Sequence, residues 1–301
     1  MKKETQSQVW RSLLYMPADN SGFLKKAQSR GADAIILDLE DSVAPLNKEN
    51  ARKLCSNAIT DLASGPADIL VRINAPLRHA IRDLEAVIKQ GLKALFIPKV
   101  ESAGLLRAID DVVTTLELEN QLIVGSIKFV PMIETPNALF SAKDIAKATK
   151  RNVGLILGGE DFAFAANLKP SAETLTPPKL QVALAAKAAG LMPIGILDTV
   201  ADFSDPNTMR DTAIRSAEFG FEGATCIHPS MVNALNYGFS PKEEDLRDAH
   251  NVVELMESTW KDNKGATQIN GKMIDMPVYE RAKALLARAK LISQKLKNNN
   301  A

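Results

Sequence analysis

Short apolar runs rich in branched residues recur along the chain, and a polar stretch long enough for one helix separates each run from the next. We predict strands over residues 12–16, 34–39, 69–73, 94–97, 128–133, 154–157, 193–197 and 223–227. The intervening stretches, such as residues 47–62, carry apolar residues at three- and four-residue intervals, which is typical of amphipathic helices. Eight strands alternating with helices predict an α/β fold, a closed parallel (β/α)8 TIM barrel, with a doubly wound open sheet as the alternative.

The C-terminal part of the chain is too long to belong to the barrel alone. About 70 residues follow His228-Pro229, and Ser240 with Glu243 forms a capping-box pattern for a helix that would run to about Trp260. A polar linker over residues 261–273 precedes a last helix that begins after Asp275. We expect a barrel over residues 1–229 that carries the functional site, and a C-terminal helical extension over residues 230–301 that packs on a neighbouring subunit.

The composition excludes several classes of protein. Lys and Arg number 37 against 36 Asp and Glu, for a net charge of +1, so the chain lacks the basic surplus of a nucleic-acid-binding protein. The longest apolar runs fall far short of the roughly 20 residues that a membrane-spanning helix needs. Residues 1–10 lack the apolar segment of a secretory signal, and the two cysteines, Cys55 and Cys226, form no CxxC motif. We expect a cytoplasmic protein with no nucleic-acid or membrane partner.

Charged residues follow nearly every predicted strand. In a parallel barrel, the carboxyl ends of the strands and the loops after them form the active face. The residues at these positions are Asp38-Leu39-Glu40-Asp41, Arg72-Ile73-Asn74, Lys99, Glu101, Glu134, Glu160-Asp161 and His228. Solvated loops are often charged, but so many carboxylates around one small mouth would repel each other unless a cation neutralises them. The pattern therefore favours a metal site.

Oxygen ligands without paired histidines or cysteines suit a hard divalent ion, Mg²⁺ first and Mn²⁺ second. Glu134 and Asp161 end neighbouring strands and are the preferred metal ligands; the alternative is that each only stabilises a helix N-terminus, an effect of roughly 0.3–1 kcal/mol. Glu40 and Asp41 would either hold water ligands of the ion or cap the next helix. Glu160 would turn away from the ion to a hydrogen bond or salt bridge.

Arg72 ends the third predicted strand. Its guanidinium would either clamp a substrate carboxylate bidentately or form a structural salt bridge with an acid of the rim. Gly158 and Gly159 lack the spacing of a phosphate-binding loop. They would instead let the backbone approach a ligand without side chains in the way.

An ordered set of short motifs runs from about residue 11 to about residue 290. The motifs are RSLLYMPADN, DAIILDLEDSVAPLNKENAR, VRIN, FIPKVES, PMIETPNAL, LGGEDFA, IHP and GKMIDMP. In this order they resemble the citrate lyase beta-subunit-like proteins, which belong to a wider group of acyl-CoA lyases that includes malyl-CoA and citramalyl-CoA lyases. The set as a whole is highly specific for the family, although no single motif is.

The resemblance implies a (β/α)8 barrel that forms a homo-oligomer, with a homotrimer favoured. It implies that Mg²⁺ is held by the glutamate of the ET motif and the aspartate of the GGED motif, here Glu134 and Asp161. Arg72 would bind the carboxylate of the substrate, and Glu40 and Asp41 would hold water ligands of the metal. Asp275 would be the acid/base group, supplied by a neighbouring subunit.

The implied function is that of a magnesium-dependent carbon–carbon lyase. It would cleave a 3-hydroxy-3-carboxyacyl-CoA of the citramalyl-CoA or malyl-CoA type to a 2-keto acid or glyoxylate plus acetyl-CoA, so its partners would be an acyl-CoA thioester and a small keto acid. Asp275 would protonate the thioester enolate during cleavage and act as the base during condensation. A metal-binding scaffold without catalysis would have no need of Asp275.

Two alternative functions stay open. One is the beta subunit of citrate lyase, acting on a citryl group carried by an acyl-carrier protein. The other is a CoA-independent, metal-dependent aldolase, which two of the chain's departures from the family pattern make conceivable. Pro177-Pro178-Lys179 stands where many relatives have Tyr-Ala-Arg before the helix that follows the sixth strand, and Ala224-Thr225 stands where a lysine is usual.

Overall fold

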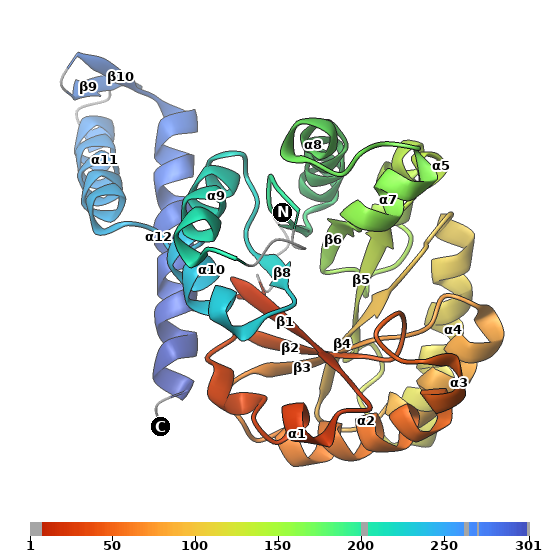
Figure 1. The fold of residues 1–301 in the computed structure, drawn as a ribbon. Helices are drawn as coiled ribbons and strands as arrows, with labels where there is room; N and C mark the ends of the chain where they lie inside the picture. The colour runs from red at the N-terminus through yellow and green to blue at the C-terminus, as the bar shows by residue number, and fades with distance from the viewer. Residues whose placement is uncertain (1–7, 200–203, 262–264, 270, 300–301) are drawn as a thin grey trace. The chain divides into compact units, whose positions relative to one another are not determined.

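Eight parallel strands form a nearly closed barrel in the computed structural model of the chain (Figure 1). The structure describes residues 8–199, 204–261, 265–269 and 271–299. The strands are β1 (Ser12–Pro17), β2 (Ala34–Asp38), β3 (Asp68–Arg72), β4 (Leu92–Ile97), β5 (Lys128–Ile133), β6 (Gly154–Leu157), β7 (Met192–Ile194) and β8 (Ala224–Cys226). Each strand from β1 to β6 pairs with the next in the chain, and β8 pairs with β1. A parallel bridge between Ile194 and Gly223 joins the two ends of the sheet, so the predicted TIM barrel is confirmed and the open sheet is excluded.

Helices follow the strands on the outside of the barrel, as α2, α3 and α4 show clearly (Figure 1). The helices of this part of the chain are α1 (Ser21–Leu24), α2 (Lys48–Leu62), α3 (Leu77–Val87), α4 (Ala103–Glu119), α5 (Pro136–Phe140), α6 (Ala142–Ala146), α7 (Gly159–Ala165), α8 (Ala172–Ala189), α9 (Pro206–Glu218) and α10 (Val232–Gly238), with short 3-10 turns η1 (Gln28–Arg30), η2 (Pro45–Asn47) and η3 (Pro229–Met231). Thr135 and Asp205 cap α5 and α9, and each precedes a proline at the first helical position. Within the described residues, no helix is long and apolar enough to cross a membrane.

The strands are apolar on both faces because both faces are covered. Side chains that point into the barrel form one buried cluster, which includes Trp10, Leu13, Ile36, Leu70, Phe96, Val130, Met132 and Ile156. Side chains that point outward pack under the helices in a second, larger cluster. The inner cluster fills the barrel below its mouth, so the space for a ligand lies at the mouth.

A buried ion pair lies at the opposite end of the barrel, where β1 and β2 begin. Nε and Nη2 of Arg11 each donate to the carboxylate of Asp33 over 2.8 Å. Arg11 and Asp33 each immediately precede a strand, so the pair lies at the amino ends of the strands. The site residues follow the carboxyl ends, at the other end of the barrel. The position of the ion pair makes it a structural pair, without access to the mouth.

The last two strands are shorter than predicted. β7 ends at Ile194 and not at residue 197, and β8 spans Ala224–Cys226 and not residues 223–227. Gly195 has a φ of 159°, and its N–H donates to the carbonyl of Gly223 over 2.8 Å. A Cβ at Gly195 would lie 2.9 Å from the ring of Phe221, so glycine is required where the chain leaves the sheet.

The chain divides into two compact units, residues 1–239 and 240–301, whereas the sequence places the boundary after residue 229. Residues 230–239 belong with the barrel because α10 packs against α9 and β1. The side chain of Asn236 accepts a hydrogen bond from Ser12 Oγ over 2.7 Å, which ties α10 to the start of β1.

The second unit has a small core of its own. It contains α11 (Glu243–Lys261), β9 (Thr267–Ile269), β10 (Lys272–Ile274) and α12 (Met276–Asn299). Met256, Ile274 and Tyr279 are buried together, and the rings of Trp260 and Tyr279 meet edge to face at 4.7 Å. The predicted polar linker is wrong in one respect: residues 267–269 and 272–274 pair as antiparallel strands. Gly271, with a φ of 76°, supplies the left-handed turn between these strands.

Candidate active site

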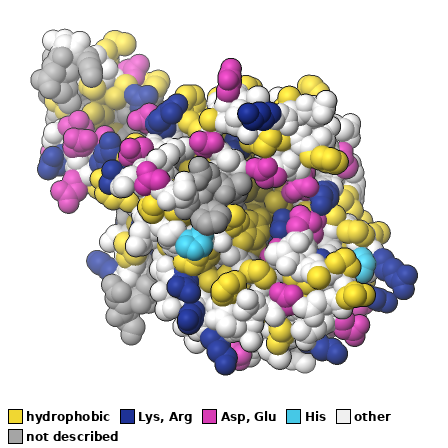
Figure 2. Space-filling model, in the orientation of Figure 1, with side chains coloured by type: hydrophobic (Ala, Val, Ile, Leu, Met, Phe, Trp, Pro, Cys, Tyr) yellow, Lys and Arg dark blue, Asp and Glu magenta, His cyan; other side chains and the backbone are white. Residues whose placement is uncertain are grey.

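The carboxyl ends of the strands bring most of the predicted site residues to one face of the barrel. In the space-filling view, this face has a hollow with an apolar interior and charged side chains at its edge (Figure 2). A cavity of about 370 Å³ opens here, and Asp41, Arg72, Glu134, Glu160 and Asp161 all line it. The site residues therefore converge although they are far apart in the sequence.

Arg72 is surrounded by acidic side chains. Its Nε and Nη2 donate to Oδ1 and Oδ2 of Asp38, each over 2.7 Å. Its Nη1 lies 3.2 Å from Oε2 of Glu40 and 3.7 Å from Oδ2 of Asp41. The guanidinium also lies over the ring of Tyr15, with Cζ 4.9 Å from the centroid. Asp38 thus closes the edge formed by Nε and Nη2, and a substrate carboxylate at the edge formed by Nη1 and Nη2 would share Nη1 with Glu40 and Asp41.

Asp38 is a residue that sequence reasoning placed on the rim without a role. It is buried, and burial opposes its ionisation, but the hydrogen bonds from Arg72 hold the pKa of its carboxyl below the ordinary value. Asp38 and Arg72 are direct partners in the register of β2 and β3. That register is the signal that identifies the pair, and it is available only once the strands are paired.

Glu134 follows β5 and is buried, with 1% of its surface exposed. Its Oε2 accepts the backbone N–H of Lys99 over 2.9 Å, while its buried Oε1 has no hydrogen-bond partner among the described residues. Burial, and then the neighbouring carboxylates of Glu40 and Asp161, raise the pKa of Glu134 to about 8. A Cβ at Gly158 would lie 2.6 Å from Cγ and Oε1 of Glu134, so this glycine makes room for the carboxyl group.

Lys99 lies among the acids of the mouth. Its Nζ is 3.2 Å from Oε1 of Glu40, 3.9 Å from Oδ1 of Asp41 and 3.8 Å from Oδ1 of Asp161. Its φ of 50° is left-handed, a conformation that costs a non-glycine residue on the order of 1 kcal/mol or more. The sequence shows only that a lysine follows a strand. The left-handed backbone at Lys99 directs its N–H to Glu134 and its side chain to Glu40, Asp41 and Asp161, and the sequence does not predict this conformation.

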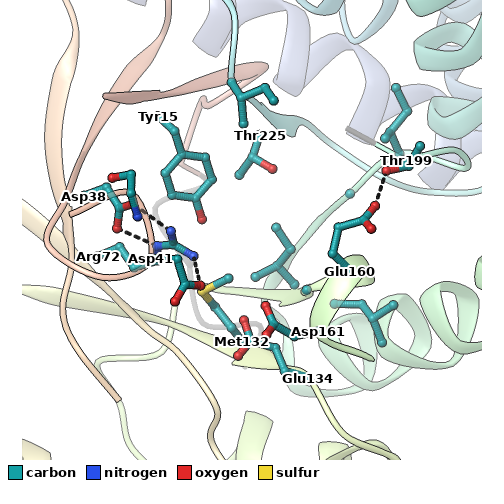
Figure 3. Close-up of a pocket in the computed structure, with 18 of the residues that line it drawn as sticks. Tyr15, Asp38, Asp41, Arg72, Met132, Glu134, Glu160, Asp161, Thr199 and Thr225 are labelled. Atoms are coloured by element: carbon teal, nitrogen blue, oxygen red, sulfur yellow. Dashed lines mark hydrogen bonds and ion pairs between the residues drawn. The ribbon is translucent and has the colours of Figure 1, made fainter. Parts of the chain in front are cut away.

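Glu160 and Asp161 point in different directions from the first turn of α7 (Figure 3). Glu160 is exposed, and its Oε1 accepts a hydrogen bond from Thr199 Oγ1 over 2.5 Å. Asp161 lies beside Glu134 (Figure 3), and its Oδ1 is 3.8 Å from Nζ of Lys99. The adjacent acids therefore occupy different sides of the cavity, because consecutive residues of a helix project about 100° apart.

The interior of the cavity is less polar than its edge. The side chains of Tyr15, Met132, Ile156 and Thr225 line it, from β1, β5, β6 and β8 (Figure 3). The hydroxyl of Tyr15 points into the cavity, and burial raises its pKa above the ordinary value. This layer would receive the apolar part of a small substrate and hold back water.

Lys179 forms part of the cavity wall from within α8. Its Nζ donates to the carbonyls of Ile196 and Asp198 over 2.9 and 2.6 Å, and burial lowers its pKa to about 8. The sequence places Pro177, Pro178 and Lys179 before the helix, but they lie inside it, since α8 begins at Ala172. The lysine therefore ties α8 to the loop after β7.

The donor set at the mouth fits a hard divalent ion. Within the described part of the chain, no three Asp, Glu, His or Cys side chains form a metal site by themselves. Magnesium needs only one or two protein carboxylates, because it keeps several waters and accepts substrate oxygens. Glu134 offers a buried oxygen without a partner, and the side chain of Asp161 beside it is 41% exposed. These two residues would hold the ion, with Glu40 and Asp41 within reach of its waters.

Asp275 lies in the second compact unit, between β10 and α12. Its Oδ1 accepts the N–H of Val278 over 3.3 Å, and its carbonyl accepts the N–H of Tyr279 over 3.0 Å. The side chain therefore caps α12 within its own unit. The role of Asp275 as an acid/base group stays a prediction.

Comparison with known proteins identifies the family. Residues 11–229 match the HpcH/HpaI aldolase/citrate lyase family, and the chain belongs to this family of carbon–carbon lyases. It is 33% identical to citrate lyase subunit beta of Haemophilus influenzae, over 93% of this chain and 97% of that protein. It is 30% identical to the mitochondrial citramalyl-CoA lyase of Homo sapiens, over 95% of this chain and 87% of that protein.

A solved structure of similar fold extends the comparison. The CitE protein of Mycobacterium tuberculosis, in complex with magnesium, acetoacetate and coenzyme A, superposes with a TM-score of 0.72. The two chains are 30% identical, over 93% of this chain and 97% of that chain. The family predicted from the ordered motifs is thus confirmed.

Proposed function

We propose that this protein is a magnesium-dependent lyase that cleaves a 3-hydroxy-3-carboxyacyl-CoA of the citramalyl-CoA or malyl-CoA type. The products would be a 2-keto acid or glyoxylate and acetyl-CoA. The observation that carries the proposal is that one cavity is lined by two groups: the carboxylates of Glu134 and Asp161, and the guanidinium of Arg72. A cation site and a carboxylate site in one cavity suit a hydroxy acid, which presents both a hydroxyl and a carboxylate.

Each residue of the mouth has a defined task in this proposal. Bound at Glu134 and Asp161, magnesium would polarise the oxygens of the substrate as a Lewis acid. Arg72 binds the substrate carboxylate through Nη1 and Nη2, and Asp38 fixes the plane of the guanidinium. The interior layer around Met132 receives the acyl part and excludes water.

Asp275 is the proposed proton donor. The substrate hydroxyl would lose its proton to solvent as it becomes the carbonyl of the keto acid and the carbon–carbon bond breaks. Asp275 would then protonate the enolate carbon next to the thioester, and it would remove that proton in the reverse direction. We propose a homo-oligomer, most simply a homotrimer, in which Asp275 of one subunit serves the mouth of another. The buried free thiols of Cys55 and Cys226 are consistent with a cytoplasmic location.

The relatives support this assignment of class. One is named citramalyl-CoA lyase, and the CitE structure contains magnesium, coenzyme A and a small keto acid together. The test is to incubate the purified chain with citramalyl-CoA and with malyl-CoA, with magnesium or with EDTA. We expect keto-acid release that EDTA abolishes. Absence of release from both thioesters in the presence of magnesium would contradict the proposal.

A second candidate is the beta subunit of a citrate lyase, acting on a citryl-acyl-carrier protein. The similarity to citrate lyase subunit beta of Haemophilus influenzae over nearly the whole of both chains favours it. The two candidates differ in the carrier of the thioester. Release of oxaloacetate from the citryl-carrier protein, together with inactivity on free CoA esters, would favour the second.

A third candidate is a CoA-independent aldolase. The observation behind it is that Lys179 directs its ammonium to two backbone carbonyls, and so has at most one donor left for a thioester or phosphate. A calorimetric titration with coenzyme A separates this candidate from the first. Binding of coenzyme A would exclude it, whereas cleavage of a free hydroxy-keto acid without coenzyme A binding would favour it.

A further inference from the structure

Lys99 contacts every carboxyl group of the candidate metal site. Its backbone N–H donates to Glu134, and its ammonium lies within 4.0 Å of Glu40, Asp41 and Asp161. Carboxyl groups outnumber cationic groups around this mouth, and Arg72 is already held by Asp38. Arg72 also reaches Glu40 and Asp41 through Nη1, at 3.2 and 3.7 Å, so the two cations share the neutralisation of these acids. Lys99 is the residue whose ammonium also lies beside Asp161, 3.8 Å from its Oδ1.

The ammonium and a divalent cation would compete for the same electrostatic site. An ion held by Asp161 and Glu134 would lie close to Nζ of Lys99, which is itself 3.8 Å from Oδ1 of Asp161. Two cations this close repel each other strongly where water is partly excluded. The lysine side chain is 40% exposed and has a flexible stem, so its charge is free to retreat to solvent.

The backbone of Lys99 has a separate task. The hydrogen bond from its N–H to Oε2 of Glu134 does not depend on where the ammonium lies. Glu134 can therefore keep its orientation when the side chain of Lys99 moves away. The left-handed φ of 50° is the feature that allows one residue to perform both tasks.

We propose that Lys99 is an internal counter-ion that competes with magnesium: it neutralises Glu40, Asp41 and Asp161 in the metal-free protein and withdraws when the ion binds. This inference rests on the magnesium site of the proposed function. It makes Lys99 a positioning residue that sets the affinity of the site. This competition weakens magnesium binding. In the metal-free protein, the ammonium of Lys99 holds the carboxylates close together by reducing their mutual repulsion.

The first test measures magnesium binding by calorimetry for the full-length wild type, Lys99→Met and Lys99→Arg. Methionine keeps the stem but removes the charge, so we expect the Kd for magnesium to fall roughly tenfold or more, and the metal-free variant to melt at a lower temperature. Lys99→Arg keeps the charge and should bind magnesium like the wild type. Lys93→Met is the matched control, because Lys93 is exposed at the other end of β4.

A second test needs no substitution. Wild-type protein is treated with an amine-reactive reagent at increasing magnesium chloride concentrations, and the modification of Lys99 is followed by mass spectrometry. We expect its rate to rise with magnesium, whereas the rate at Lys93 stays constant. A rate that falls or does not change would overturn the inference, and so would unchanged or weakened magnesium binding by Lys99→Met. Wild-type protein that binds no magnesium would overturn the metal site itself. Failure of the metal site can therefore be distinguished from failure of the inference about Lys99.

Discussion

The carboxylate of Asp38 holds two nitrogens of Arg72, each over 2.7 Å, and thereby decides which edge of the guanidinium faces the cavity. The two residues are register partners at the carboxyl ends of β2 and β3. Parallel pairing places them side by side, and their shared burial makes the bidentate geometry strong. A rim arginine that would otherwise be mobile is thus oriented before any substrate arrives.

Asp38→Asn should lower the stability of the protein and also weaken substrate binding, and the two effects can be measured separately. Leaving Arg72 buried without its carboxylate should cost roughly 3–5 kcal/mol of unfolding free energy and should raise KM for the substrate, because the guanidinium loses its orientation. Urea unfolding and steady-state kinetics measure the two effects. Asp33→Asn is the control, since Asp33 pairs equally with Arg11 at the other end of the barrel and should cost stability without changing KM. Equal KM values in all three proteins would contradict the assignment.

The adjacent acids of α7 should respond differently to loss of charge. Asp161→Asn should weaken magnesium binding by at least roughly 100-fold, because it removes a proposed ligand. Glu160→Gln should leave the affinity nearly unchanged, since glutamine still accepts the hydrogen bond from Thr199. Calorimetric titration with magnesium chloride compares them. Equal losses in both variants would show that the ion does not distinguish the two acids.

Gly158→Ala should displace Glu134 without changing any charge. A Cβ at this position would lie 2.6 Å from Cγ and Oε1 of Glu134, and the φ of −77° is one that alanine adopts freely, so the effect would come from the clash. We expect magnesium affinity to fall by roughly 10- to 100-fold. Gly104→Ala is the matched control, because its Cβ would meet only Oγ of Ser102 at 3.6 Å. Full magnesium affinity in Gly158→Ala would refute the close packing of Glu134.

The raised pKa of Glu134 predicts a pH dependence of stability in metal-free protein. The folded pKa is about 8 and the ordinary value is 4.5, so the folded state holds the proton more tightly than the unfolded chain. Stability should therefore fall as the pH rises between these values, by on the order of 5 kcal/mol relative to Glu134→Gln. Unfolding curves at several pH values, recorded in EDTA, test this. Saturating magnesium should remove much of the difference, because the ion favours the ionised carboxylate.

Asp275→Asn should abolish turnover but keep the fold and the metal. Asparagine can still cap α12 by accepting the N–H of Val278, so unfolding free energy should hardly change. Loss of an acid/base group should lower kcat by roughly 10²- to 10⁴-fold, with magnesium affinity unchanged. Turnover at the wild-type rate would refute the proposed role.

Mixed oligomers test where Asp275 acts. Asp275→Asn and Glu134→Gln subunits are each expected to be inactive alone. If Asp275 serves a neighbouring subunit, co-refolded mixtures should regain activity, because some mouths combine an intact Glu134 with an intact Asp275. Mixtures that stay inactive, although mass spectrometry shows mixed assemblies, would place Asp275 in its own subunit's site.

The sequence by itself determined the barrel, because eight apolar runs alternating with helices have few ways to bury both faces of a sheet. It also placed Glu134, Asp161 and Arg72 on one face, since carboxyl ends of parallel strands share a side. Only the tertiary structure decided how Asp38 closes an edge of Arg72 and how Lys99 contacts four acids, because both depend on strand register and one left-handed residue. The sequence predicted that Asp161 faces the metal site and that Glu160 turns away, and in the structure Asp161 lies beside Glu134. Distances between side chains from different strands arise from packing, and no local pattern encodes them.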